Sequence, residues 1–286
     1  FMRGYYYCSL STFLNILNRK QIYLSDPLKM NDALEIKWCL EKIKNNTPPC
    51  RSGTPIDIEF FIKEEYNNIM DILDADGQNS IYISCFSKKS DILSQWRAYA
   101  DDGKGVSIGF QLDKLNSADN LLEEEIIYLN DKSMNQMIDT LQTLYDPIVS
   151  LIAYDNKSHK YENKQELVKK VLHELIPVLA KYKNPAFKEE QEVRLIYCRS
   201  MEIEKRLYQY NQKKEEKLNM LELDHEYRIT GDNKITEFIK LDFNPKSIKH
   251  ICIGPKCSME ANDLMRIVKE LLNIDIKVTR SKASYR

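Results

Sequence analysis

Residue types that build many common functional sites are scarce in this chain of 286 residues. Its four histidines are not paired at the spacing of metal ligands, so a zinc centre is not expected. Its seven cysteines lie at irregular intervals and form no Cys-x-x-Cys pair, which predicts buried thiols rather than disulfides or metal ligands. Buried thiols of this kind are typical of a reducing compartment. We therefore expect no metal site.

Signals for membranes and for phosphate-binding loops are also missing. No apolar stretch approaches the length that spans a bilayer and no signal peptide opens the sequence, so we expect a cytoplasmic protein without membrane contact. The Gly103-Lys104-Gly105 turn lacks the spacing of a P-loop or a dinucleotide fingerprint and is interpreted as a helix end. Serine-hydrolase, zinc-peptidase and calcium-loop motifs do not occur. A net charge of −1 excludes an overall attraction to nucleic acid but leaves room for a local basic patch.

What the sequence does contain is the composition of a folded domain, with 43% hydrophobic and 30% charged residues. Short segments of strand character alternate irregularly with amphipathic helices, and one hairpin is expected around residues 231–233. This pattern favours an α+β fold, with mostly antiparallel sheets and flanking helices, over a doubly wound parallel fold. We predict a single domain over residues 1–286, in which two long helical patterns at about 131–182 pair as a helical insertion.

The individual elements follow from periodicity and from capping residues. Strands are predicted at 5–8, 22–25, 81–87, 106–111, 125–129, from Glu192 onward, at 225–229, 235–243, 249–254 and 276–280. Helices are predicted from Ser9 or Ser11, at 56–73, from a Ser90 cap, and at 258–272. Residues 30–32 are expected to begin a loop or a helix cap, and the charge-dense residues 202–222 a solvated helix or loop.

The segment 183–198 carries charged side chains directly into a strand-forming apolar run. Alternation with a period of two would place Glu190, Glu192 and Arg194 on one face of an extended segment, with apolar residues on the other. Further along the charged face, Ile196 and Cys198 are apolar, so this face should pass from an open cleft into a core. Two carboxylates and a guanidinium at a sheet edge suit a reaction centre, and they equally suit a structural ion pair.

Aromatic side chains allow a similar pair of interpretations. Trp96 and Tyr99 lie three residues apart on one helical face, where they either pack in a core or form a platform for a nicotinamide or a nucleobase. The strand that contains Tyr7 has the same ambiguity, because an outward tyrosine can bind a ligand through its hydroxyl group.

Several motifs, in a fixed order, resemble a bacterial family named for its lack of a known role, the domain of unknown function numbered 2971. The Glu190 and Glu192 carboxylates with Phe187 and Arg194 match its Phe-x-x-Glu-x-Glu-x-Arg pattern. Where the family tends to have Asp-Pro-Phe-Glu, this chain has residues 32–35 as Asp-Ala-Leu-Glu. The other matching segments are Tyr7-Cys8-Ser9-Leu10, Leu24-Ser25-Asp26-Pro27, Ser84-Cys85-Phe86-Ser87, Gln95-Trp96-Arg97-Ala98-Tyr99-Ala100, residues 104–110, Ile253-Gly254-Pro255 and residues 281–286.

A weaker resemblance links the first strand, helix and Asn-Asp loop to bacterial toxins that ADP-ribosylate DNA. The triplet 190–192 is also similar to the Glu-x-Glu of arginine-directed ADP-ribosyltransferases. The resemblance implies that NAD is a substrate, that the acceptor is a macromolecule or water, and that phage defence or stress response is the setting. It further implies catalytic roles for Glu192 and its partner Glu190. It implies a cofactor-binding group of Tyr7, Ser9, Trp96, Tyr99 and Arg194.

Two other classes of function remain open at this stage. A nucleotide or nucleic-acid binding module would use a flat basic surface, built from Arg97, Lys104, Arg194 and Arg199. A nuclease would instead gather carboxylates around magnesium. Its candidate carboxylates are Asp32, Glu35, Glu190 and Glu192. The sequence specifies neither the acceptor nor the oligomeric state.

Overall fold

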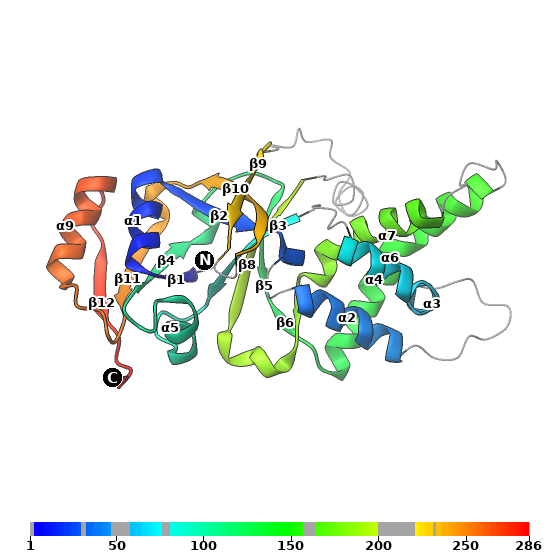
Figure 1. Cartoon of the computed structure of the whole chain (residues 1–286), viewed down its shortest axis with the longest axis horizontal. Coiled ribbons are helices and arrows are strands. Elements are labelled where there is room, and N and C mark those ends of the chain that lie inside the picture. The colour runs from blue at the N-terminus through cyan, green and yellow to red at the C-terminus, as the bar shows by residue number, and fades with distance from the viewer. Residues whose placement is uncertain are drawn as a thin grey trace.

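One long mixed sheet forms the frame of the protein in the computed structural model (Figure 1). The structure describes residues 3–29, 33–46, 58–75, 81–156, 164–199, 221–230 and 233–285. The strands of this sheet are β1 (Arg3–Cys8), β2 (Gln21–Ser25), β3 (Ile81–Ser87), β4 (Val106–Gln111), β5 (Leu121–Glu125), β8 (Glu192–Cys198), β9 (His225–Ile229), β10 (Ile235–Asp242), β11 (Ile248–Ile253) and β12 (Lys277–Arg280). Their order is β12-β11-β4-β1-β3-β2-β10-β9, and β3 also pairs with β8, which pairs with β5.

The pairing within this sheet is antiparallel apart from the parallel pair β11 and β12. A second, two-stranded sheet joins β6 (Ile127–Tyr128) and β7 (Tyr182–Lys183) in parallel. The predicted α+β class with mostly antiparallel strands is therefore confirmed.

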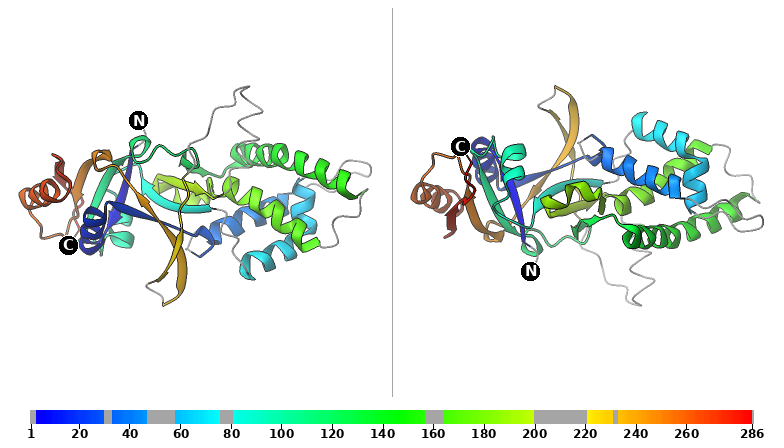
Figure 2. Two further views of the ribbon diagram at one scale, coloured as in Figure 1. Left: turned by 90° about the horizontal axis from the view of Figure 1, so that it is seen from above. Right: turned by 90° about the horizontal axis from the view of Figure 1, so that it is seen from below.

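Helices collect at the two ends of the sheet, as the views in Figures 1 and 2 show. At one end α1 (Leu10–Arg19) and α9 (Ala261–Leu272) cover the strands, and α5 (Leu93–Tyr99) lies close to β1. At the other end lie five helices of the described part of the chain. They are α2 (Ala33–Asn46), α3 (Ile58–Glu64), α4 (Tyr66–Ala75), α6 (Asp131–Asn156) and α7 (Lys164–Leu179). Four 3₁₀ turns complete the described elements, η1 (Pro27–Lys29), η2 (Leu112–Lys114), η3 (Pro185–Glu190) and η4 (Pro245–Ser247).

Strands β3 and β8 separate two hydrophobic cores. Alternate residues of β3 point to opposite sides, so Ile81 and Ile83 pack with the five-helix group while Tyr82 and Phe86 pack with α1 and α9. The same alternation in β8 sends Ile196 to the helical side and Leu195 to the other. The prediction that the face bearing Glu192 and Arg194 continues into a core is thus confirmed.

The two edges of β3 are paired very differently. Against β8 every residue from Ile81 to Ser87 has a partner. On its other edge β3 pairs with β2 only at Ile83 and with β1 only at Ser87. Between these two points β1 and β2 diverge, so residues 84–86 of β3 are not paired on this edge. These residues line a cleft.

Several predicted elements differ from the observed ones. Residues 33–46 form α2, for which no helix was predicted because its amphipathic pattern is weak. Residues 30–32, which were expected to begin a loop or a helix cap, lie outside the described residues. The helix predicted at 56–73 is interrupted at Glu65 and becomes α3 and α4. The strand predicted at 125–129 is present in part, since β5 ends at Glu125 and the short strand β6 covers Ile127–Tyr128. Ser90 is not the cap of α5, whose N-cap is Ile92. Most of the segment 202–222 and residues 231–232 of the expected hairpin lie outside the described residues.

The predicted helix end at 103–105 is confirmed by its geometry. Gly103 has φ +84°, a left-handed conformation that favours glycine. Its amide donates to the carbonyl groups of Trp96 in α5 and of Ala100, which follows α5. At Gly105 a Cβ would lie 2.0 Å from the carbonyl oxygen of Cys8, so only glycine fits. Within the described ranges, no helix combines the length and the apolar character that crossing a bilayer requires.

Candidate functional site

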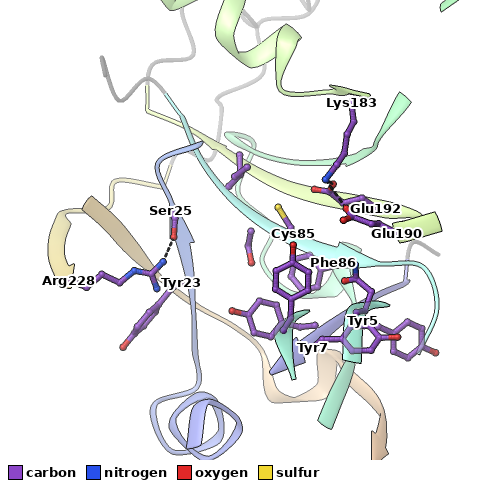
Figure 3. Close-up of a pocket in the computed structure, with 15 residues that line it drawn as sticks. Tyr5, Tyr7, Tyr23, Ser25, Cys85, Phe86, Lys183, Glu190, Glu192 and Arg228 are labelled. Atoms are coloured by element: carbon purple, nitrogen blue, oxygen red, sulfur yellow. Dashed lines mark hydrogen bonds and ion pairs between the residues drawn. The ribbon is translucent and has the colours of Figure 1, made fainter. Parts of the chain in front are cut away.

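The cleft beside β3 is lined by strands β1, β2, β3 and β9, helix α5 and the segment 183–192, and it encloses about 180 Å³ (Figure 3). Its lining is rich in tyrosine and carries charged groups on opposite sides. In Figure 3, Lys183, Glu190 and Glu192 lie on one side of Cys85, and Arg228 lies on the other beside Tyr23 and Ser25. The full lining is Tyr5, Tyr6, Tyr7, Tyr23, Ser25, Ile83, Ser84, Cys85, Phe86, Gln95, Tyr99, Lys183, Glu190, Glu192 and Arg228.

A network of five charged side chains closes one end of the cleft, and we call it the carboxylate end. Lys183 Nζ lies 2.9 Å from Glu35 Oε1, 2.7 Å from Glu190 Oε2 and 2.8 Å from Glu192 Oε2. An ammonium group has three hydrogens to donate, and each has a carboxylate acceptor here. Because Lys183 is only 4% exposed, these bonds form largely out of water.

Arg194 supplies the second cation of the carboxylate end. Its Nε donates to Glu192 Oε1 over 2.5 Å, and its second terminal nitrogen donates to Glu35 Oε2 over 2.7 Å. The remaining terminal nitrogen donates to the carbonyl group of Ala180 over 2.7 Å. Arg194 is 1% exposed. Three carboxylates thus surround two buried cations, which leaves one negative charge in excess.

Electrostatics hold Glu192 and Lys183 in their charged forms. Burial disfavours the anion of Glu192, but Arg194 and Lys183 outweigh this effect and lower the pKa of Glu192 to about 2. Burial likewise opposes the charge of Lys183, and its carboxylate partners more than offset this and raise the pKa of its ammonium group. Glu192 therefore remains an anion whose two oxygens both accept hydrogen bonds from cations.

Glu190 differs from Glu192 in conformation and in exposure. It does not belong to the extended segment that was predicted, because Asn184 caps a 3₁₀ turn with Pro185 in its first position, and this turn continues to Glu190. Gln191 then takes a left-handed conformation with φ 45° before β8 begins. The side chain of Glu190 is 18% exposed against 5% for Glu192, so Glu190 is the carboxylate that reaches further into the cleft.

Bonds to β3 and β6 fix this turn. Ser87 Oγ donates to the carbonyl group of Glu190 over 2.8 Å, and the amide of Lys88 donates to the carbonyl group of Gln191 over 2.8 Å. The amide of Glu192 donates to the hydroxyl group of Tyr128 over 2.9 Å. The backbone on both sides of the two glutamates is therefore held in place.

The predicted aromatic residues divide between the wall of the cleft and its support. Tyr99 is 53% exposed and lines the cleft. Trp96 is fully buried behind it, with its ring centroid 4.7 Å from that of Tyr7 and its indole nitrogen donating to Asp91. Trp96 does not line the cleft and is positioned to support Tyr7, which does. The hydroxyl group of Tyr7 is bonded to the backbone of Lys89 and Ile92.

Ser9 lies away from the other predicted residues. Its hydroxyl group accepts from the amide of Thr12 and caps α1. It lines a different depression with Lys104 and Lys256. Of the residues predicted from the resemblance, the structure therefore places Glu190, Glu192, Tyr7 and Tyr99 around one cleft, and it leaves Ser9, Trp96 and Arg194 outside the lining.

Further residues complete the site. Glu35, which the sequence suggested only as a magnesium ligand of a nuclease, arrives from α2, 159 positions before its partner Arg194. Arg228, which the sequence did not single out, arrives from β9. Lys183 opens the charged segment, but its position at the centre of three carboxylates depends on tertiary contacts. Tyr6 also lines the cleft, and burial raises the pKa of its hydroxyl group to about 12, so that it keeps its proton at neutral pH.

The geometry bears on both alternative interpretations. Arg194 is buried, so it cannot contribute to the flat basic surface expected of a nucleic-acid binding module. Three of the four carboxylates of the nuclease hypothesis do gather, but around Lys183 Nζ, and Asp32 lies outside the described residues. Among the residues that the structure describes, no group of three or more His, Cys, Asp or Glu side chains could hold a metal ion.

Comparison with known families adds one match. The family described as "Protein of unknown function (DUF2971)" matches residues 95–195. This match supports the family resemblance that the motifs predicted. It includes α5 from Gln95 onward, β4, the turn η3 and the start of β8, and with them Tyr99, Glu190 and Glu192. No curated protein and no solved structure matches the chain.

Proposed function

We propose that this protein cleaves the bond between nicotinamide and ribose in NAD and transfers ADP-ribose to a macromolecule or to water. In this reaction the bond between ribose C1′ and the ring nitrogen breaks, and its electron pair neutralises the pyridinium ring. The positive charge that develops on the ribose is stabilised by a nearby carboxylate. The acceptor oxygen then bonds to C1′ and loses its proton.

The observation that carries the proposal is the placement of Glu190 in the wall of a tyrosine-lined cleft. The carboxylate end has one negative charge in excess, which suits a cationic ring and a cationic transition state. The rings of Tyr5 and Tyr99 offer flat surfaces for nicotinamide. At about 180 Å³ the cleft is smaller than the ~300–1000 Å³ of most ligand pockets, so it would enclose only part of the dinucleotide.

The two glutamates receive different roles in this proposal. Glu190 is the more exposed of the two and would contact the ribose, so we assign it as the catalytic carboxylate. Glu192 has both oxygens bonded to buried cations, so we assign it as a positioning residue. It holds Lys183, and Lys183 in turn holds Glu190.

A second candidate function is the binding of a nucleotide without cleavage. The ion pair of 2.7 Å between Lys183 and Glu190 favours it, because a neutralised carboxylate stabilises a developing positive charge less well. The two candidates differ in whether nicotinamide is released.

The test is nicotinamide release from NAD by the purified protein, with and without added DNA and protein acceptors. We expect turnover in the wild type and a loss of about a hundredfold or more in kcat for Glu190→Gln, which keeps the shape but removes the charge. Glu189→Gln is the matched control, because Glu189 is an exposed residue of the same 3₁₀ turn and does not line the cleft.

The outcomes separate the two candidate functions. Turnover that survives in Glu190→Gln at the level of the Glu189→Gln control would contradict the assigned role of Glu190. Binding of NAD without release of nicotinamide under any acceptor condition would support the binding module instead.

A further inference from the structure

The end of the cleft opposite the carboxylate end is built around Arg228, and we call it the arginine end. Arg228 lies on β9, is half-buried and lines the cleft. One of its terminal nitrogens donates to Ser25 Oγ over 2.7 Å, and its guanidinium group lies 5.5 Å from the ring centroid of Phe238. These two contacts hold the guanidinium group beside the cleft before any ligand arrives.

Arg228 has no carboxylate partner among the residues that the structure describes. Two acidic side chains of the same hairpin are engaged elsewhere. Glu226 pairs with Lys240 over 2.6 Å, and Glu237 accepts from the hydroxyl group of Tyr82 over 3.0 Å. A guanidinium group has five N–H donors arranged to bind planar or tetrahedral anions.

One buried polar atom of the arginine end, Arg228 Nε, also lacks a partner within the described part of the chain. Ser84 Oγ lacks one too, but Ser84 follows Ile83, the residue of β3 that pairs with Ser25, so its side chain points to the opposite face of the strand from Ser25. Buried polar groups in folded proteins are nearly always hydrogen-bonded, and this exception on a guanidinium group without a carboxylate partner indicates a missing acceptor.

We infer that the arginine end is an anion subsite, in which Arg228 together with Ser25 binds a phosphate group of the ligand. Identification of that phosphate as part of NAD rests on the proposed function, whereas the subsite itself does not. The ligand would then lie across the tyrosine-lined cleft with its phosphate at Arg228 and its sugar toward Glu190. Arginine binds phosphate with paired N–H donors, and serine hydroxyl groups add further donors.

Isothermal titration with four probes tests this inference. ADP-ribose and ADP carry phosphate groups, and nicotinamide riboside and adenosine do not. We expect Arg228→Gln to weaken the binding of ADP-ribose and ADP by about tenfold to a hundredfold, the effect of losing bonds to a charged group. Binding of the two phosphate-free probes should stay within about twofold, because the lost donors do not contact them.

Lys240→Gln is the matched control. Lys240 also lies near the ring of Phe238, at 6.0 Å, but it has its own partner in Glu226 and does not line the cleft. Removing its charge should leave all four affinities unchanged within about twofold, since its charge is already paired at the surface. Arg228→Lys, which keeps the charge but not the paired donors, should bind ADP-ribose with intermediate affinity.

Each outcome decides the inference. Equal weakening of phosphate-bearing and phosphate-free probes by Arg228→Gln, or equal effects of Arg228→Gln and Lys240→Gln, would overturn it. Failure of the wild type to bind either phosphate-bearing probe at millimolar concentration would overturn it too. Binding of ADP that depends on Arg228 without release of nicotinamide from NAD would uphold the subsite and contradict only the proposed reaction.

Discussion

The two ends of the cleft each contain a buried or half-buried arginine, and the contrast between them indicates their tasks. At the carboxylate end Arg194 is 1% exposed and donates to Glu35, Glu192 and a backbone carbonyl group. At the arginine end Arg228 donates to Ser25, and its Nε has no acceptor among the described residues. The first arginine is saturated by the protein itself, and the second is left for another molecule.

Saturation and incompleteness have different consequences for stability and for binding. A buried ion pair with all its bonds made is very sensitive to loss of one partner, because the other charge is then left in a medium that solvates it poorly. A group whose bonds are incomplete contributes little to folding and can contribute much to binding. The changes below test this contrast, in order of decreasing expected effect on stability.

The largest loss is expected for Arg194→Met. Without Arg194, the two buried carboxylates of Glu35 and Glu192 must share the single positive charge of Lys183, so negative charge is left buried without a partner. Such a change should lower the free energy of unfolding by about 3–5 kcal/mol. Urea denaturation followed by circular dichroism measures it. Lys181→Met is the control, because the pair of Lys181 with Glu124 is partly exposed and should contribute less than about 1 kcal/mol. Similar losses in both variants would contradict the contrast.

Acid should destabilise the carboxylate end. The pKa of Glu192 is about 2 in the folded protein and has an ordinary value of 4.5, so the folded state releases this proton more readily than the unfolded chain. The resulting stability is present above about pH 4.5 and is lost as the pH falls toward 2, amounting to about 2–3 kcal/mol. Unfolding at a series of pH values should show this loss in the wild type and a shallower one in Glu192→Gln. Identical slopes in the two proteins would count against the low pKa.

Stability should respond to pH in the opposite direction through Asp26, which follows Ser25 in the sequence and does not line the cleft. Burial raises the pKa of Asp26 to about 6, although its bond to the amide of Leu28 opposes this. Because the folded state holds this proton more tightly, the wild type should gain stability as the pH falls from about 7 toward 4. Asp26→Asn should remove this dependence and stabilise the protein at pH 8 by about 1–3 kcal/mol. A stability of Asp26→Asn below that of the wild type at pH 8 would be the contrary result.

The smallest effect on stability is expected for Arg228→Gln. This change removes one hydrogen bond to Ser25 and the contact with the ring of Phe238. The free energy of unfolding should fall by about 1 kcal/mol or less. A loss as large as that of Arg194→Met would mean that both arginines are structural, and the contrast between the two ends would disappear.

Local sequence patterns were sufficient for much of the sheet and for the order of the core faces. Alternation in β8 predicted that Glu192 and Arg194 share a face and that this face continues into Ile196. Alternation failed at Glu190, because the Asn184 cap and the left-handed Gln191 place Glu190 in a 3₁₀ turn. A pattern of charges alone does not report such a change of backbone conformation.

Long-range contacts account for what the sequence could not predict about the site. Glu35 reaches Arg194 from a helix that the apolar pattern did not reveal, and Arg228 reaches Ser25 from a hairpin near the end of the chain. The burial of Trp96 against Tyr7 likewise depends on how α5 packs on β1. None of these three contacts could be predicted from residue spacing.

The central claim is that one end of the cleft performs the chemistry and the other holds the ligand. Steady-state kinetics of nicotinamide release tests it most directly, in the wild type, Glu190→Gln, Arg228→Gln and the Lys240→Gln control. We predict that Glu190→Gln lowers kcat by about a hundredfold or more with little change in KM, and that Arg228→Gln raises KM by about tenfold or more with little change in kcat. Equal loss of kcat in both variants, or kinetics of either variant that match the control, would contradict the account.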